Sequence, residues 1–592
     1  MIEPRFHWLY PDRAPLDAGF TEAVRAHGGS ARLARVMAAR GIGADEVDRF
    51  FGPALDSLHD PARLPDADRA VDRIARAREA AEGVLVVGDF DADGLTGLAI
   101  MVRALRTLGL DAVPHVPTRL DDGHGLSLRA VELASATGRR LVITVDTGSS
   151  SGGEIAAAGA AGIDVIVTDH HRVPPELPPA VAVVNPHRSD AGYPDRRLTG
   201  SGVALKMAAL LLERLGGIPA GVTTSDLADL AMIGTVADVA PVLGENRAIA
   251  RLGLERIRRD PRPGIAALLA AARVAAAEAT LETVGFALAP RLNAAGRVGD
   301  ADEAAALLLT DDPEAAAVHA AALDAANLVR RDVSRAALEE ARALVDAEGG
   351  RDGAPVLVRG PWPIGIIGLV AGRLAEDSGL PAVVATRVGE HLRASCRAPA
   401  GYDLAAALQG CDDLLVRHGG HCGAAGFEVE ASRWDELAER LRGLLVAVVP
   451  RDARRSLTLD LALPARSVDY AHMRDLAALG PTGPGNPDPV VGVHGLTVTR
   501  IRAAAGGHAQ LTLRREVDVL DGIAFGRGDL VGTVREGDRV DVAARLMSRR
   551  FGGYESLQLG VIDVAAARTA ASDPAGAADP ADTAVAATAG RA

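Results

Sequence analysis

The sequence predicts an α/β protein with two α/β domains, joined by a helical bridge and followed by a small β-barrel. From residue 84 onward, short apolar runs alternate with helical segments, which indicates a doubly wound parallel sheet. A second series of this kind begins near Pro355. In residues 510–513, 540–546 and 557–561 apolar and polar residues alternate instead, which is typical of barrel strands.

Composition and periodicity divide the chain into six segments. The first has helical spacing and no strand-like run, and the bridge is rich in Ala, Leu, Arg and Glu. The last contains Ala, Asp, Pro and Thr without periodicity, so we expect disorder there. The predicted segments are a helical N-terminal lead-in (1–80), a first α/β domain (81–261), a helical bridge (262–348), a second α/β domain (349–455), a β-barrel domain (456–565) and a tail (566–592).

The composition of the 592 residues restricts the class of protein. A net charge of −14 argues against a surface coated in basic residues, so any polyanion must be bound by a local groove or through metal ions. Three cysteines are too few and too poorly spaced for a disulfide framework or a structural zinc site, which favours a reducing compartment. Neither a signal peptide nor an apolar run of about 20 residues is present. We therefore expect a soluble, cytoplasmic protein that does not bind membranes.

Three carboxylates alternate directly after the first predicted strand, in Asp89-Phe-Asp91-Ala-Asp93-Gly94. This spacing matches the first half of a calcium loop, but the twelfth position, which needs a bidentate Glu, is Ile100. The motif also follows a strand and not a helix. We therefore place these acids at the carboxyl end of a strand, where α/β sheets bind ligands.

Further acids and imidazoles follow the later strands. Asp146 ends the strand at 141–145, Asp169-His170-His171 ends the strand at 165–168, and Asp238 follows a helical run. A single acid at the end of a strand is usually a cap or turn residue, but three strands that end alike indicate a common site. Adjacent histidines cannot both point the same way, so one could bind metal while the other faces substrate. The ligands favour two Mn²⁺ or Mg²⁺ ions and a phosphoester hydrolysis.

These motifs resemble the DHH phosphoesterase superfamily. Gly88–Gly94, Val145-Asp-Thr-Gly148 and Asp169-His-His171 carry the resemblance of the first α/β domain, and Gly419–Gly426 looks like the signature of the associated DHHA1 domain. The order of motifs is similar to that of the superfamily's bacterial single-strand-specific exonucleases from about residue 30 to 565. The resemblance implies that the barrel is an oligonucleotide-binding fold. It also implies a metal centre formed by Asp89, Asp91, Asp93, Asp146, His170 and Asp238.

The same resemblance implies roles in catalysis and substrate binding. Asp146 would bridge the two ions, and His171 would contact the scissile phosphate or assist the leaving oxygen. Two departures concern substrate recognition: His124 stands where Tyr is usual, and Pro363 where His is common. The implied substrate-binding residues are Arg119, His124, Arg291, Asn293, Ser395, Arg397, Gly419, Gly420 and His421.

Two basic groups have an open interpretation. Arg549, Arg550, Phe551 and Tyr554 in the barrel could stack on and hold a strand, or could form a solvated hairpin with one buried aromatic residue. Arg330 and Arg331 on the bridge are equally compatible with DNA binding and with a solvated helix face.

The resemblance implies a metal-dependent exonuclease that degrades single-stranded DNA from the 5′ end to mononucleotides, in DNA repair and recombination. The resemblance also implies a helicase and a single-strand-binding protein as partners. No Gly-x-x-x-x-Gly-Lys-Ser/Thr loop is present, so the chain should not power its own unwinding. One alternative is a phosphodiesterase for short oligonucleotides or cyclic dinucleotides. Another is a scaffold that binds DNA without catalysis, although such relatives lose metal ligands that are present here.

Overall fold

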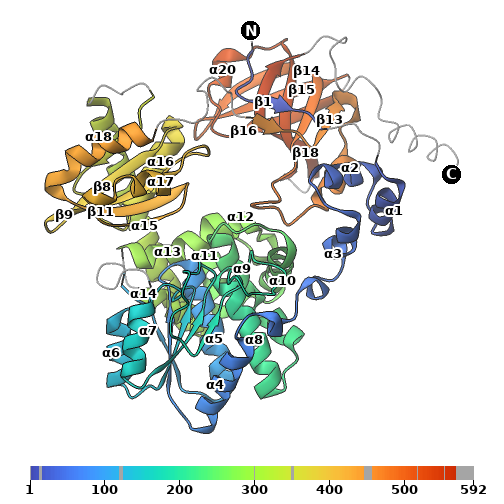
Figure 1. Cartoon of the computed structure of the whole chain (residues 1–592). Helices are drawn as coiled ribbons and strands as arrows, with labels where there is room; N and C mark the ends of the chain where they lie inside the picture. The colour runs from blue at the N-terminus through green and yellow to red at the C-terminus, as the bar shows by residue number, and fades with distance from the viewer. Residues whose placement is uncertain are drawn as a thin grey trace. The chain divides into compact units, whose positions relative to one another are not determined.

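The computed structural model divides the chain into two compact units (Figure 1). One unit contains Leu58–Arg451, and the other combines Met1–Ser57 with Asp452–Ala592. The structure describes residues 2–11, 16–118, 125–298, 301–347, 353–445, 456–516, 518–551 and 554–567. The tail that we expect to be disordered lies outside these ranges, apart from its first two residues.

The first α/β domain has a five-stranded, wholly parallel sheet with the order β3-β2-β4-β5-β6. Its central strands consist of β-branched and other apolar residues that are buried on both faces, as in parallel sheets generally. The strands are β2 (Val84–Gly88), β3 (Ala112–His115), β4 (Leu141–Val145), β5 (Asp164–Thr168) and β6 (Ala182–Val184). This confirms the predicted doubly wound sheet.

Helices cover both faces of this sheet. Leu85, Val87 and Val142 pack on one side against α6 (Leu128–Ala136) and α7 (Gly152–Ala160). Val84, Val86 and Ile143 belong to a larger core on the opposite face. The helices that contribute to that core include α4 (Ala67–Glu79), α5 (Ala92–Thr107), α8 (Gly200–Gly216), α9 (Ala220–Ala237) and α10 (Gly244–Arg259).

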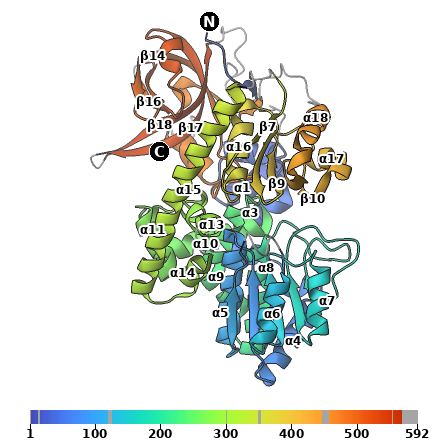
Figure 2. The same ribbon diagram turned by 90° about the vertical axis from the view of Figure 1, so that its left-hand side faces the viewer.

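The predicted bridge is helical and ends in one long helix, α15 (Pro313–Ala347), which Figure 2 shows passing from the bridge to the second α/β domain. Ala337 and Ala341 of this helix pack against Val358 and Ile367 of that domain. A π-helical turn (Val284–Leu288) interrupts the helix that begins at Leu281. The other bridge helices are α11 (Pro263–Ala271), α12 (Leu281–Thr283), α13 (Ala289–Val298) and α14 (Ala301–Leu309).

The second α/β domain has a mixed sheet with the order β10-β11-β9-β8-β7. Only β7 and β8 are parallel, and the other neighbours are antiparallel. The strands are β7 (Val356–Arg359), β8 (Ala382–Val388), β9 (His391–Arg397), β10 (Leu415–Gly420) and β11 (Ala424–Glu430). Its helices are α16 (Ile367–Ser378), α17 (Leu404–Gln409) and α18 (Trp434–Leu444).

The other unit contains a closed five-stranded barrel, because β14 pairs with β17 as well as β15. The barrel strands are β14 (Val491–Ala504), β15 (His508–Arg515), β16 (Asp518–Ala524), β17 (Arg539–Phe551) and β18 (Tyr554–Ala566). Strand β13 (Leu461–Pro464) pairs with β14, and the short helices α19 (Tyr470–Ala477) and α20 (Leu530–Thr533) complete this region. This confirms the predicted oligonucleotide-binding type of barrel.

The N-terminal segment differs from the purely helical lead-in that we expected. Its helices α1 (Ala18–Ala26), α2 (Ala31–Ala39) and α3 (Val47–Phe51) are present, but β1 (His7–Leu9) is a strand that pairs in parallel with β12 (Ser456–Thr458). Phe20, Val24 and Met37 share a core with the barrel residues. Three residues have too little pattern to predict a strand, and β1 forms because distant β12 supplies its hydrogen bonds.

Candidate metal centre and substrate-end site

The acid motif forms the turn between β2 and α5. Asp91 is the N-cap of α5, and its Oδ1 accepts hydrogen bonds from Asp93 N at 3.0 Å and Gly94 N at 3.1 Å. A Cβ at Gly94 would lie 2.5 Å from the backbone N and O of Asp89, so only glycine permits so tight a turn. Burial, followed by repulsion from Asp89 and Asp93, raises the pKa of Asp91 to about 7.

Asp93 is held by the start of α8. Gly200 N donates to its Oδ2 at 2.7 Å, and Ser201 N donates to its Oδ1 at 3.1 Å. The positive end of a 17-residue helix dipole therefore points at this carboxylate. A Cβ at Gly234 of α9 would overlap Asp93 Oδ1, so a glycine is needed beside it. These contacts fix the orientation of Asp93.

Asp146 follows β4 with a left-handed backbone conformation, φ 61°. Its Oδ1 is buried and forms no hydrogen bond of acceptable geometry with any described residue, although His170 Nε2 lies 3.1 Å away. Burial, followed by repulsion from Asp93 and Asp91, raises its pKa well above the ordinary value. A buried carboxylate oxygen without a donor, among other acids, is suited to a cation.

The two histidines of the Asp-His-His motif point in different directions, as expected. His170 Nε2 faces Asp146, whereas His171 Nδ1 lies 2.8 Å from Asp169 Oδ1. Although burial opposes it, hydrogen bonds from the His171 ring, Ser149 N and His171 N hold the pKa of Asp169 below its usual range. The hydrogen bond to Asp169 raises the pKa of His171 to about 9. Asp169 therefore orients His171 and stabilises its protonated form.

Asp238 is the C-cap residue of α9, and its Oδ2 lies 4.0 Å from His170 Nε2. Burial and repulsion from Asp93 raise its pKa to about 6. The next residue, Val239, has φ 59°, a conformation that is rare for a β-branched side chain. This left-handed residue ends α9 directly beside the carboxylate.

These residues form three overlapping groups, and within each group the ligand atoms lie within 4.8 Å of one another. The chemistry fits two hard or borderline divalent ions, because carboxylate oxygens predominate and the raised pKa values show that negative charge there is uncompensated. The structure thus brings together all six predicted metal ligands and His171. The groups are Asp89, Asp91 and Asp146; Asp93, His170 and Asp238; and Asp146, His170 and His171.

A second set of predicted site residues meets on the sheet of the second α/β domain. Ser395 of β9 pairs with Gly426 of β11, which pairs with Gly419 of β10. Gly420 has φ 137°, and a Cβ there would overlap the backbone of Ala425. His421 N donates to Ala424 O at 2.7 Å and closes this turn.

Arg397 lies on the same strand as Ser395, and its Nη1 lies 3.2 Å from Ser395 Oγ. Burial lowers the pKa of Arg397, which nevertheless remains a cation at neutral pH. A Cβ at Gly368 would lie 3.0 Å from Ser395 Oγ and 3.3 Å from Arg397 Nη2. The backbone turn, hydroxyl and guanidinium together suit a phosphate group.

The remaining predicted substrate residues are placed differently. Asn293 Oδ1 accepts a hydrogen bond from Ala92 N at 2.7 Å and therefore contacts the metal-binding turn, whereas Arg291 is paired with Asp324 at 2.8 Å. Arg119 and His124 lie outside the described residues. In the barrel, Arg549 and Arg550 belong to β17, which forms a hairpin with β18 through the pair Phe551 and Tyr554.

Sequence reasoning missed the residues that orient these ligands. Asp93 accepts hydrogen bonds from the amides of Gly200 and Ser201, and it packs against Gly234. None of these three residues has an acidic or imidazole side chain that would have singled it out in the sequence. Asn185 is fully buried and donates to Ser149 Oγ and His171 O. The one available signal was the Gly-Ser-Gly run at 200–202 at the start of an apolar helical segment, a pattern compatible with an anion-binding helix N-terminus.

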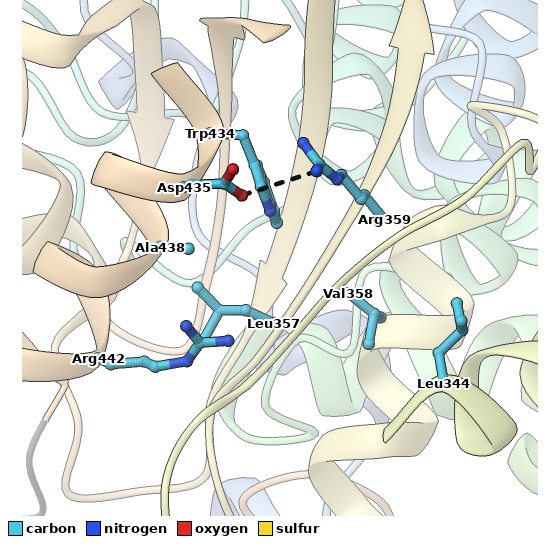
Figure 3. A pocket seen from close by; sticks show the side chains of 8 residues that line it. All are labelled: Leu344, Leu357, Val358, Arg359, Trp434, Asp435, Ala438 and Arg442. Atoms are coloured by element: carbon cyan, nitrogen blue, oxygen red, sulfur yellow. Dashed lines mark ion pairs between the residues drawn. The ribbon is translucent and has the colours of Figure 1, made fainter. Parts of the chain in front are cut away.

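A groove in the second α/β domain is separate from the metal centre (Figure 3). It has a volume of about 470 Å³ and follows the free edge of β7, and no metal ligand lines it. Arg359 and Asp435 form an ion pair of 3.6 Å across it. Its lining residues are Leu344, Leu357, Val358, Arg359, Trp434, Asp435, Ala438 and Arg442.

Comparison with known families agrees with this fold and cluster. Residues 83–235 match the DHH family, N-terminal domain, and residues 459–563 match the RecJ OB domain. The parallel sheet with its acid and imidazole cluster thus defines the chain as a DHH-family protein. None of the helices within the described ranges is both long and apolar enough to cross a membrane.

Individual proteins narrow the assignment. The chain is 35% identical over 566 residues to the single-stranded-DNA-specific exonuclease RecJ of Dickeya dadantii (strain 3937). This alignment covers 89% of this chain and 95% of that protein. It is 34% identical to the corresponding protein of Escherichia coli (strain K12), over 90% of this chain and 95% of that protein. The chain belongs to the RecJ family.

Solved structures agree at the level of the fold. RecJ from Thermus thermophilus in complex with Mn²⁺ has a TM-score of 0.81 and 30% sequence identity, and the match covers 95% of this chain and 80% of that chain. The same protein in complex with Mg²⁺ has a TM-score of 0.76 and 29% identity, with coverage of 95% and 79%.

Proposed function

We propose that this chain is a metal-dependent exonuclease that hydrolyses single-stranded DNA from the 5′ end and releases mononucleotides. One observation carries the proposal. Five carboxylates and an imidazole converge at the carboxyl edge of the parallel sheet, in a chain that aligns over most of its length with single-stranded-DNA-specific exonucleases. Every predicted metal ligand is present, which argues against a scaffold without catalysis.

The two ion sites follow from the ligand groups. Asp89 and Asp91 would hold one Mn²⁺ or Mg²⁺ ion, Asp93, His170 and Asp238 the other, and Asp146 would contribute to both. When bound, such ions lower the pKa of a water molecule and neutralise charge on the phosphate. Asp93 enters this arrangement already oriented by the α8 amides, so little ligand reorganisation is required.

His171 is suited to act on the scissile phosphate. Its Nδ1 is engaged by Asp169, and its side chain is 52% exposed, so Nε2 is the nitrogen available to substrate. With a pKa of about 9 it is protonated at neutral pH and can donate to a phosphate oxygen or to the leaving oxygen. Asp169 is its positioning residue.

Recognition of the 5′ end is assigned to the second site. Arg397, Ser395 and the Gly419-Gly420-His421 turn would hold the terminal phosphate of the strand. Arg119 and His124 would add a contact to the leading nucleotide, as the family resemblance implies. A phosphate site of this kind, made of residues other than the metal ligands, would make the enzyme dependent on the strand's end.

The cellular role is part of the proposal. An enzyme of this type would act in DNA repair and recombination in the cytoplasm, with a helicase that supplies single strands and a single-strand-binding protein that holds them. The barrel provides an additional surface for the strand.

Degradation of a 5′-labelled single strand, a duplex and a dinucleotide tests the proposal, with Mn²⁺, Mg²⁺ or EDTA. We expect mononucleotides from the long single strand with either ion, and loss of activity with EDTA or in Asp146→Asn. Asp226→Asn is the matched control, because Asp226 is an exposed acid that pairs with Arg256. Cleavage of the dinucleotide alone would support the small-substrate phosphodiesterase, and strand binding without cleavage would support the scaffold.

A further inference from the structure

Phe286 is an aromatic side chain whose position folding does not explain. It lies in the π-helical turn between Val284 and Leu288, which are both fully buried, yet Phe286 itself is 81% exposed. The whole chain contains only nine phenylalanines. Burial of a phenyl ring stabilises a fold, so an exposed ring loses this stabilisation. Because π-helical turns are frequent at functional sites, the exposed ring indicates a binding surface for a ligand.

The π-turn lies beside the metal centre. A Cβ at Gly285 would be 3.3 Å from Val236 Cγ1, and Val236 precedes the ligand Asp238 by two residues. Val239, directly after that ligand, is 67% exposed in its left-handed conformation. We call Val236, Val239 and Phe286 the apolar rim. Val236 belongs to α9 and Phe286 to the π-helical turn, whereas Val239 lies two residues beyond the end of α9.

The distance from the rim to the metal-binding turn can be estimated along the helix. Asn293, which contacts Ala92 N, follows Phe286 by seven residues. At 1.5 Å per residue this corresponds to roughly 10 Å. Stacked nucleotides are spaced by about 3.4 Å, so the rim lies about three nucleotides from the cluster.

We propose that the apolar rim is a stacking platform on which the Phe286 ring holds a base of the single strand about three nucleotides from the scissile phosphate. This inference rests on the proposed function and adds to it a determinant of substrate length. A phenyl face accepts any base, so the platform contributes affinity without sequence preference. Val239, exposed directly after the ligand Asp238, adds apolar surface on the α9 side of the rim.

The test compares wild type, Phe286→Ala and Phe286→Trp on a 20-nucleotide strand and on a dinucleotide. Loss of one base stack should raise KM for the long strand by roughly five- to 150-fold in Phe286→Ala, with kcat nearly unchanged. Phe286→Trp should restore the wild-type KM. The dinucleotide, too short to reach the rim, should be hydrolysed equally by all three. Val222→Ala is the matched control, because Val222 is an exposed valine at the opposite end of α9.

A second readout locates the stacked base. 2-Aminopurine placed at successive positions of a phosphorothioate-linked strand should be quenched at one position by wild type and not by Phe286→Ala. An unchanged KM and unchanged quenching in Phe286→Ala, while wild type degrades the strand, would overturn the platform alone. Failure of wild type to degrade any strand would overturn the proposed function and the platform with it.

Discussion

Removal of the divalent ions should make the stability of the Leu58–Arg451 unit depend on pH in an unusual direction. The folded-state pKa of Asp91 is about 7, above its ordinary value of 3.8. The folded state therefore binds a proton more tightly than the unfolded state. Stability is full below about pH 4, falls as the pH rises toward 7, and is constant above that value.

The magnitude follows from the size of the shift. A rise from 3.8 to about 7 is roughly 3 pKa units, or about 4 kcal/mol at 1.36 kcal/mol per unit, of which about 2 kcal/mol is lost between pH 5 and 7. Asp146 acts in the same direction. At about 2 °C per kcal/mol for a large unit, the unfolding temperature should fall by on the order of 5 °C.

The assay is thermal unfolding of the EDTA-treated protein at pH 5, 6, 7 and 8 and constant ionic strength. Addition of Mn²⁺ should raise the unfolding temperature, and more so at pH 8 than at pH 5, because the ligands must lose protons to bind it. Asp91→Asn should flatten the dependence without loss of the helix cap, because the Asn oxygen still accepts from Asp93 N and Gly94 N. Asp226→Asn should retain the wild-type slope.

Two results would refute this reasoning. The first is a metal-free protein whose unfolding temperature stays level or rises between pH 5 and 7. The second is an Asp91→Asn variant with the same slope as wild type, which would remove the cluster as the cause.

Three further predictions concern single side chains. Gly200→Ala should destabilise the protein by about 1–3 kcal/mol and abolish metal-dependent cleavage, because the new Cβ overlaps Asp146. Gly153→Ala is the control and should leave the activity unchanged, because a Cβ at Gly153 meets nothing within 4 Å. Arg397→Ala should weaken binding of 5′-phosphorylated strands by roughly ten- to 100-fold, measured by fluorescence anisotropy; equal losses on 5′-hydroxyl strands would contradict its assignment. Asp169→Asn should lower the pKa of His171 from about 9, so the alkaline limb of the profile of kcat against pH should move to lower pH. An alkaline limb at the wild-type position would exclude the positioning role of Asp169.

The predictable part of the fold follows from local patterns. Strands β2, β4 and β5 each consist of a short apolar run, and an acid follows each of them. Because parallel strands end at a common edge, the convergence of Asp89, Asp146 and Asp169 could be expected without coordinates. A small β-barrel could likewise be predicted from the alternation of apolar and polar residues, whereas its closure through β14 and β17 is seen only in the structure.

Other features depend on contacts between distant segments. The strand β1 exists through its pairing with β12, and the N-terminal helices share their core with the barrel. Neither arrangement leaves a local pattern, which is why the lead-in was expected to be helical only. Similarly, the α8 amides that hold Asp93 come from another part of the chain.

The amino-acid pattern specifies which chemical groups gather at the sheet edge, because strand periodicity and the order of strands and helices fix where each acid emerges. How those groups are oriented and charged depends on contacts between distant segments. Asp169 binds His171, Asp146 Oδ1 has no donor among the described residues, and Phe286 is exposed in the π-helical turn. The physical reason is that burial, hydrogen-bond partners and mutual repulsion are set by residues far apart in the chain, whereas sequence patterns record mainly local geometry.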